Sequence, residues 1–172
     1  MTINVQFVYG AGPDNLFGSG LRELRDQVIK KFGAKVYVPR IIDYTEYETL
    51  LRLLRKWSDP TILVGHSCGC MSITQAALAI SMERVPYLMA IAPSIYCPVA
   101  ALPNNVRRAT QMTSWWGDFF NPGGRDLLYK TGANTTTILD FVYTGYGHVP
   151  APYAPVVSKR LLAEVDLASG GK

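Results

Sequence analysis

The residues with the clearest chemical potential surround a serine. Positions 65–69 hold Gly-His-Ser-Cys-Gly, between an apolar run and a run with helical spacing. This arrangement predicts a strand, a tight turn and a helix, with Ser67 at the turn. A serine there adopts a cramped backbone, and Gly65 and Gly69 remove side chains that would collide with it. The turn then presents the hydroxyl beside amides at a helix N-terminus, which can stabilise a negatively charged oxygen.

A serine hydroxyl is a good nucleophile near neutral pH only when a neighbouring base removes its proton. The chain contains two histidines. His66 directly precedes Ser67, and we expect its ring to point away from the hydroxyl. His148 follows the last predicted strand in a Gly-Tyr-Gly-His turn. His148 is therefore the expected base.

On this strand-serine-helix pattern the sequence resembles the α/β-hydrolase family. The resemblance covers nearly the whole chain but begins at the family's third strand, which implies a minimal fold without a lid domain. It also implies the chain order serine, acid, histidine, which Ser67 and His148 fit. The implied donors to an oxyanion are the amides of Cys68 and Ala11, and Tyr9 stands where many members carry a histidine.

The resemblance further implies that the acid follows the penultimate strand, where its carboxylate holds the histidine in the reactive tautomer. Asp118 fits this position best. Asp126 is the alternative, because an irregular loop can carry the carboxylate further along the chain, whereas Asp140 lies inside the last predicted strand. Two aromatic residues close to the acid, Trp116 and Phe119, are candidates for substrate binding, although aromatic runs also belong to cores.

The elements that must position these residues alternate between strand and helix. We expect strands at 3–9, 35–39, 61–64, 85–92, 109–116 and 135–142. We expect a helix that Ser19 caps and that ends at residue 32, a helix that a capping box at 45–48 opens and that ends before residue 57, and helices at 71–81 and from 155 onward. This alternation, without a repeat or linker, predicts a single α/β domain over 1–172 with a mainly parallel central sheet and a frayed tail at 169–172.

Composition narrows the possible partners. The 172 residues include 48% hydrophobic and 17% charged residues, as in a globular fold, and the net charge of +4 comes from scattered lysines and arginines. We therefore expect no nucleic-acid partner. The uncharged stretch 60–82 contains glycines and polar residues that disfavour a membrane span. Because the first residues do not resemble a signal peptide, we expect a cytoplasmic protein.

Three cysteines, at 68, 70 and 97, cannot all pair. Two of them lie beside the proposed nucleophile, so we expect buried free thiols rather than disulfides or a metal site. The sequence calls for no cofactor and no metal.

Together these residues predict a serine hydrolase that cleaves a small-molecule carboxylic ester or thioester through an acyl-enzyme intermediate. The same machinery would serve an acyltransferase or a peptidase, depending on which acceptor reaches the acyl-enzyme. From another class, a hydrolase-like binding protein without turnover is the alternative. The acyl group, the alcohol and the oligomeric state stay open at this stage.

Overall fold

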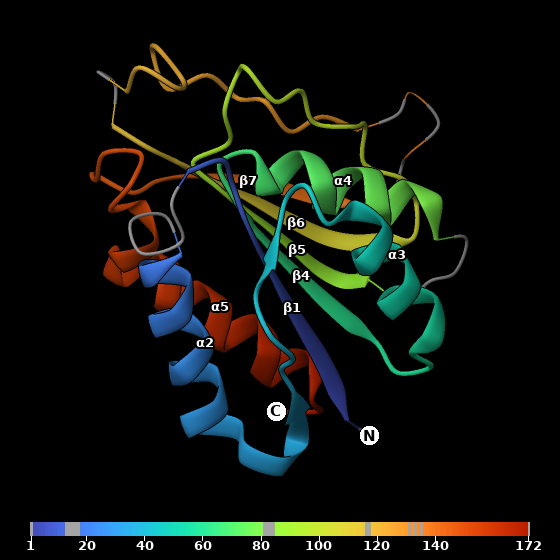
Figure 1. The fold of residues 1–172 in the computed structure, drawn as a ribbon. Coiled ribbons are helices and arrows are strands. Elements are labelled where there is room, and N and C mark those ends of the chain that lie inside the picture. The colour runs from blue at the N-terminus through green and yellow to red at the C-terminus, as the bar shows by residue number, and fades with distance from the viewer. Residues whose placement is uncertain are drawn as a thin grey trace.

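The computed structural model describes residues 2–12, 18–80, 85–115, 118–130, 132, 134 and 136–171. Within these ranges seven strands form one sheet, in the order β2-β1-β4-β5-β6-β7 with β3 also paired to β1 (Figure 1). The strands are β1 (Ile3–Tyr9), β2 (Val36–Tyr37), β3 (Ile42–Asp43), β4 (Thr61–His66), β5 (Val85–Ile91), β6 (Val106–Thr113) and β7 (Ile138–Tyr143). Every pair is parallel, so the carboxyl ends of the strands share one edge.

Helices cover both faces of this sheet. They are α2 (Ser19–Phe32), α3 (Tyr47–Lys56), α4 (Gly69–Ala79) and α5 (Pro155–Ala168), with short 3-10 turns η1 (Gly33–Lys35) and η2 (Ala151–Tyr153). Helices α2 and α5 lie on one face, and α3 and α4 lie on the other (Figure 1). The result is the expected three-layer α/β fold, and no lid domain is evident among the residues that the structure describes.

A separate apolar core fills each side of the sheet, because successive strand residues point to opposite faces. Val64 belongs to the core beneath α2 and α5, together with Leu161. Its neighbour Leu63 belongs to the core beneath α3 and α4, together with Ile73. Burial on both faces explains why the central strands are continuous apolar runs in the sequence.

The strand boundaries differ from expectation beyond β5. Strand β6 begins at Val106 and ends at Thr113, whereas the sequence predicted 109–116. The start of β6 was not predicted because it contains arginines, which are typical of surface loops. One of them, Arg108, forms an ion pair with the buried Glu164 at 3.1 Å. Its end is set by Trp115, whose amide donates to the carbonyl of Tyr146 at 2.6 Å in a turn outside the strand.

The segment between β6 and β7 has an irregular backbone and is anchored by one buried side chain. Gln111 of β6 accepts hydrogen bonds at Oε1 from the amides of Leu127 and Leu128, at 2.7 and 2.9 Å. Its Nε2 donates to the carbonyl of Arg125 at 2.8 Å. One strand residue therefore fixes the return path of the loop that carries Asp118.

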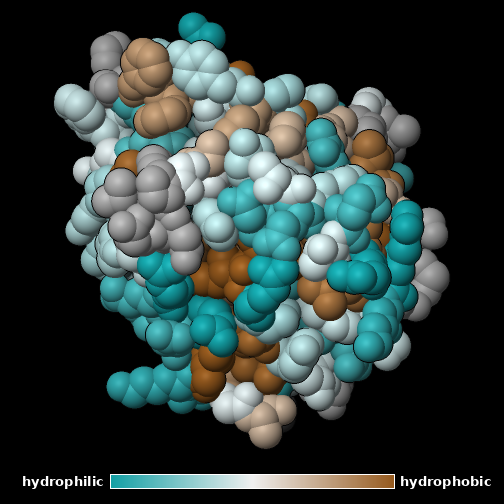
Figure 2. Space-filling view, in the orientation of Figure 1, coloured by the Kyte–Doolittle hydropathy of each residue, from teal (hydrophilic) through white to brown (hydrophobic). Residues whose placement is uncertain are grey.

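Polar residues cover most of the surface seen in Figure 2, where hydrophobic residues appear only in separate small areas. In the described ranges, no helix combines the length and the apolar character that crossing a bilayer requires.

Candidate active site

The turn after β4 has the backbone expected from its glycines. Ser67 adopts a left-handed φ of 55° between β4 and α4. A Cβ at Gly65 would lie 2.8 Å from the carbonyl carbon of Gly69, and a Cβ at Gly69 would lie 2.2 Å from the oxygen of Val8. Only glycine at both positions allows the helix to begin this close to the sheet.

Ser67, His148 and Asp118 form a continuous chain of hydrogen bonds. The Nε2 atom of His148 lies 2.8 Å from Ser67 Oγ, and its Nδ1 atom lies 2.9 Å from Asp118 Oδ2. In the neutral tautomer that fits these contacts, Nδ1–H donates to the carboxylate and Nε2 accepts from the hydroxyl. Such a chain can take a proton from serine as the oxygen attacks a carbonyl carbon.

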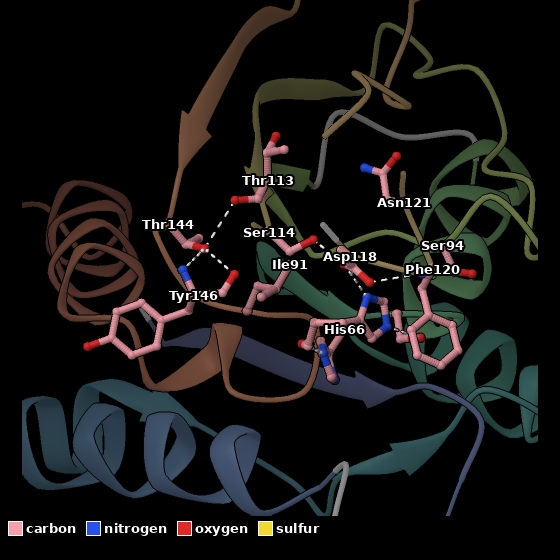
Figure 3. A network of polar contacts seen from close by, with 12 residues as sticks. His66, Ile91, Ser94, Thr113, Ser114, Asp118, Phe120, Asn121, Thr144 and Tyr146 are labelled. Carbon is pink, nitrogen blue, oxygen red and sulfur yellow. Dashed lines mark hydrogen bonds and ion pairs between the residues drawn. The ribbon is translucent and has the colours of Figure 1, made fainter. Parts of the chain in front are cut away.

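The carboxylate of Asp118 is held by further donors. Ser114 donates from its hydroxyl to Oδ2, and the amide of Phe120 donates to Oδ1 at 2.8 Å. Figure 3 shows Ser114 pointing toward Asp118. The alternative Asp126 is exposed, and Asp140 bonds Arg160 at 2.5 Å. The structure thus brings Asp118 to the imidazole. Ser114 was missed by sequence reasoning.

Burial lowers the pKa of His148 below its ordinary value of 6.5, although the nearby charge and hydrogen bond of Asp118 act in the opposite direction. The ring of Phe120 stacks on the imidazole at 4.3 Å between centroids and contributes to this apolar surrounding. The lowered pKa favours the neutral imidazole, which is the state that accepts a proton.

His66 supports the loop that carries His148. Its Nε2 atom lies 2.8 Å from the main-chain oxygen of His148, which can only accept, so His66 is the donor. The two imidazole rings are 5.3 Å apart. Sequence reasoning set His66 aside as the base because its ring was expected to point away from the hydroxyl, and nothing local indicates its contact with a loop 82 positions away.

The proposed oxyanion donors lie where β1 meets the serine turn. A Cβ at Gly10 would come within 2.7 Å of the Cys68 amide nitrogen and 2.6 Å of Ser67 Cβ. The backbone after β1 therefore packs directly against this turn. The next residue, Ala11, is exposed. The amide of Ala11 directly follows the residue that packs against the serine turn, and its role as an oxyanion donor stays a prediction.

Aromatic rings extend from His148 to the surface. Phe119 is 72% exposed, and its ring contacts that of Phe120 at 5.7 Å and that of Tyr96 at 5.9 Å. We call Tyr96, Phe119 and Phe120 the aromatic ledge. The sequence indicated Phe119 but not Tyr96, which comes from a different loop. Trp116, the other predicted substrate-binding residue, lies outside the described residues.

The expectation of free thiols is wrong for two of the three cysteines. Cys68 and Cys97 form a disulfide with their Cα atoms 5.1 Å apart. They lie in loops that leave the adjacent parallel strands β4 and β5 at the same edge, which brings them together. Cys70 is free and buried, and burial raises the pKa of its thiol, so it is held as an unreactive thiol. Among the described residues, no group of three or more His, Cys, Asp or Glu is arranged to hold a metal ion.

Several solved structures resemble this fold over nearly the whole chain. A protein described as a YdeN-like hydrolase from Pectobacterium atrosepticum has a TM-score of 0.59 and 19% identity, over 97% of this chain and 92% of its own. The RedJ thioesterase of Streptomyces coelicolor has a TM-score of 0.60 and 13% identity, over 97% and 85%. A cutinase-like protein from Cryptococcus has a TM-score of 0.58 and 13% identity, over 99% and 96%. No protein-family model and no curated protein matches the sequence.

Proposed function

From an α/β-hydrolase fold in which Ser67 lies within hydrogen-bond reach of His148, we propose that this chain is a serine hydrolase that cleaves carboxylic esters or thioesters. The observation that carries the proposal is the 2.8 Å separation between His148 Nε2 and Ser67 Oγ. The names of similar structures, which include hydrolases and thioesterases, agree with this chemistry. One fold can host many functions, so the geometry of the site is what supports this one.

In the proposed reaction Ser67 Oγ attacks the carbonyl carbon while His148 Nε2 takes its proton. The amides of Cys68 and Ala11 stabilise the tetrahedral oxyanion, and each such donor contributes about 3 kcal/mol. His148 then protonates the departing alcohol or thiol, which leaves an acyl-enzyme. Water, activated by the same imidazole, releases the acid. Asp118 keeps the ring in its reactive tautomer throughout.

The aromatic ledge is the proposed contact for the acyl or aryl part of the substrate. Phe119 presents an exposed ring whose neighbour, Phe120, stacks on His148. Apolar groups gain free energy when such rings remove them from water. We therefore propose a small-molecule ester or thioester with an apolar group that lies against Phe119.

The test is covalent labelling with a fluorophosphonate, which reacts with activated serines. We expect labelling of the wild-type chain and none of Ser67→Ala, while Ser158→Ala, a helix serine outside the site, labels normally. Circular dichroism checks that each variant is folded. A folded wild-type chain that neither labels nor hydrolyses aryl esters would favour the binding-protein alternative.

A panel of acetyl esters, thioesters and anilides, all assayed by the acetate they release, tests the substrate class. We expect turnover of the first two and little turnover of the amide. Products formed with added alcohols or amines would identify an acyltransferase.

A further inference from the structure

The Cys68–Cys97 disulfide joins two unusual turns that leave neighbouring strands. Ser67 directly precedes Cys68 and has a φ of 55°, and Ala92 directly follows β5 and has a φ of 45°. Left-handed backbone is costly for residues other than glycine, and it persists only where the surrounding structure fixes it. The disulfide supplies a covalent link between the chain segments that follow these two residues.

Cys97 belongs to a short, internally bonded turn at residues 94–97, which we call the bridge segment. Its amide donates to the carbonyl of Ser94 at 3.2 Å, and the amide of Tyr96 donates to Ser94 Oγ at 3.2 Å. Ser94 itself is 1% exposed. Because the turn is tied within itself, a displacement of Cys97 is passed to the rest of the bridge segment.

The bridge segment also supports the loop that carries the proposed acid. The amide of Ile95 donates to the carbonyl of Phe120 at 2.9 Å, while the ring of Tyr96 contacts that of Phe119. Phe120 in turn stacks on His148. The bridge segment is therefore bonded covalently to the serine turn at one end and packed against the histidine's stacking partner at the other.

We propose that Cys68 and Cys97 are positioning residues whose disulfide sets the turnover of this site, so that a thiol reductant lowers activity reversibly. This inference rests on the hydrolase function proposed above. The disulfide fixes the Cys68 amide where the oxyanion forms, and through the bridge segment it holds Phe120 on His148. Misplacement of a catalytic group by about 1 Å can reduce rates about a hundredfold.

The reduction itself is ordinary thiol–disulfide exchange. A thiolate attacks the sulfur of Cys97, which is only partly buried, and Cys68 leaves as a thiolate that takes up a proton. A second thiol resolves the mixed disulfide, so that two cysteine thiols and one oxidised reductant are formed. Cys68 stands at the N-cap of α4, where a departing thiolate is stabilised.

The experiment compares oxidised and dithiothreitol-treated wild-type protein on an aryl acetate, with the bond state verified by mass spectrometry. We expect kcat to fall at least about tenfold on reduction, KM to change less than about twofold, and kcat to recover with oxidised glutathione. Cys97→Ser should have low kcat with or without reductant. The control Cys70→Ala should respond as the wild type does.

Several outcomes would overturn the inference. One is an unchanged kcat together with a lower unfolding midpoint, because the disulfide would then only stabilise the fold. Absence of the bond in the isolated protein is another. If reduction removes the circular dichroism signal, the Cys68→Ala/Cys97→Ala variant decides. A folded variant with low kcat supports the inference, whereas a folded variant with full kcat, or a variant that does not fold, overturns it. If the oxidised wild type lacks turnover and labelling of Ser67, the proposed function fails instead.

Discussion

His66 donates a hydrogen bond to the main-chain oxygen of His148, so the residue that precedes the proposed nucleophile holds the loop of the proposed base. His66 is fully buried, and its replacement by Phe leaves a buried carbonyl without this donor. A buried group in that state costs about 1–3 kcal/mol. We expect His66→Phe to lose this much stability in urea unfolding and to lower kcat/KM about tenfold. His66→Gln, which keeps an N–H donor, should lose less.

The lowered pKa of His148 predicts the acid limb of the pH profile. Because burial lowers this pKa below 6.5, the imidazole stays neutral at more acidic pH than a free histidine does. We expect kcat/KM to fall with acid at a midpoint below 6.5. Since the charge of Asp118 raises this pKa, Asp118→Asn should move the midpoint further down. A wild-type midpoint above 6.5 would contradict the prediction.

The choice between two aspartates can be tested directly. Asp118→Asn removes the acceptor of His148 Nδ1–H and favours the wrong tautomer, for which a loss of kcat of about ten-thousandfold is typical. Asp126→Asn alters an exposed carboxylate and should stay within about twofold of the wild type. The reverse order of effects in single-turnover assays would refute the assignment of Asp118.

Gly10 is expected to tolerate no side chain. In Gly10→Ala the new Cβ would lie 2.6 Å from Ser67 Cβ and 2.7 Å from the Cys68 amide nitrogen, so the serine turn must shift. We expect kcat/KM to fall about a hundredfold, with about 1–3 kcal/mol lost in stability. The matched control is Gly132→Ala, where the added Cβ meets nothing within 4 Å. If the two variants were equally active, the contact of Gly10 with the serine turn would not matter for catalysis.

The aromatic ledge predicts a chain-length effect. Phe119→Ala should raise KM for aryl esters of long acyl chains by about three- to tenfold, roughly 1 kcal/mol of lost apolar contact, and should leave acetate hydrolysis unchanged. Tyr37→Ala removes another exposed ring, at the opposite end of the sheet in β2, and should change neither value. A uniform loss on all chain lengths would mean that Phe119 acts on the catalytic groups.

Sequence reasoning found the parts of the site that depend on local backbone. The glycines around Ser67 are visible because they act within one turn, and the apolar runs of β4 and β5 are visible because both faces are buried. The parallel sheet followed from the alternation of strands and helices. The sequence favoured Asp118 over Asp126 as the acid, but the choice depends on the contact of Asp118 with His148, which only the structure shows.

The features that the sequence did not reveal depend on which loops contact one another in the folded chain. Cys97 and Tyr96 give no local signal, because their partners come from other strands' loops. The start of β6 was missed because Arg108 looks like a surface residue until Glu164 of α5 is placed beside it. Such contacts across distant segments are invisible to periodicity.

The 81 positions that separate Ser67 from His148 also have a consequence for a nascent chain. At about 5–20 residues per second, the ribosome adds the imidazole roughly 4–16 seconds after the hydroxyl. During that interval the growing polypeptide carries an inert serine. The proposed chemistry can start only after the chain has been extended past His148, so a product terminated before that residue should leave nearby esters intact.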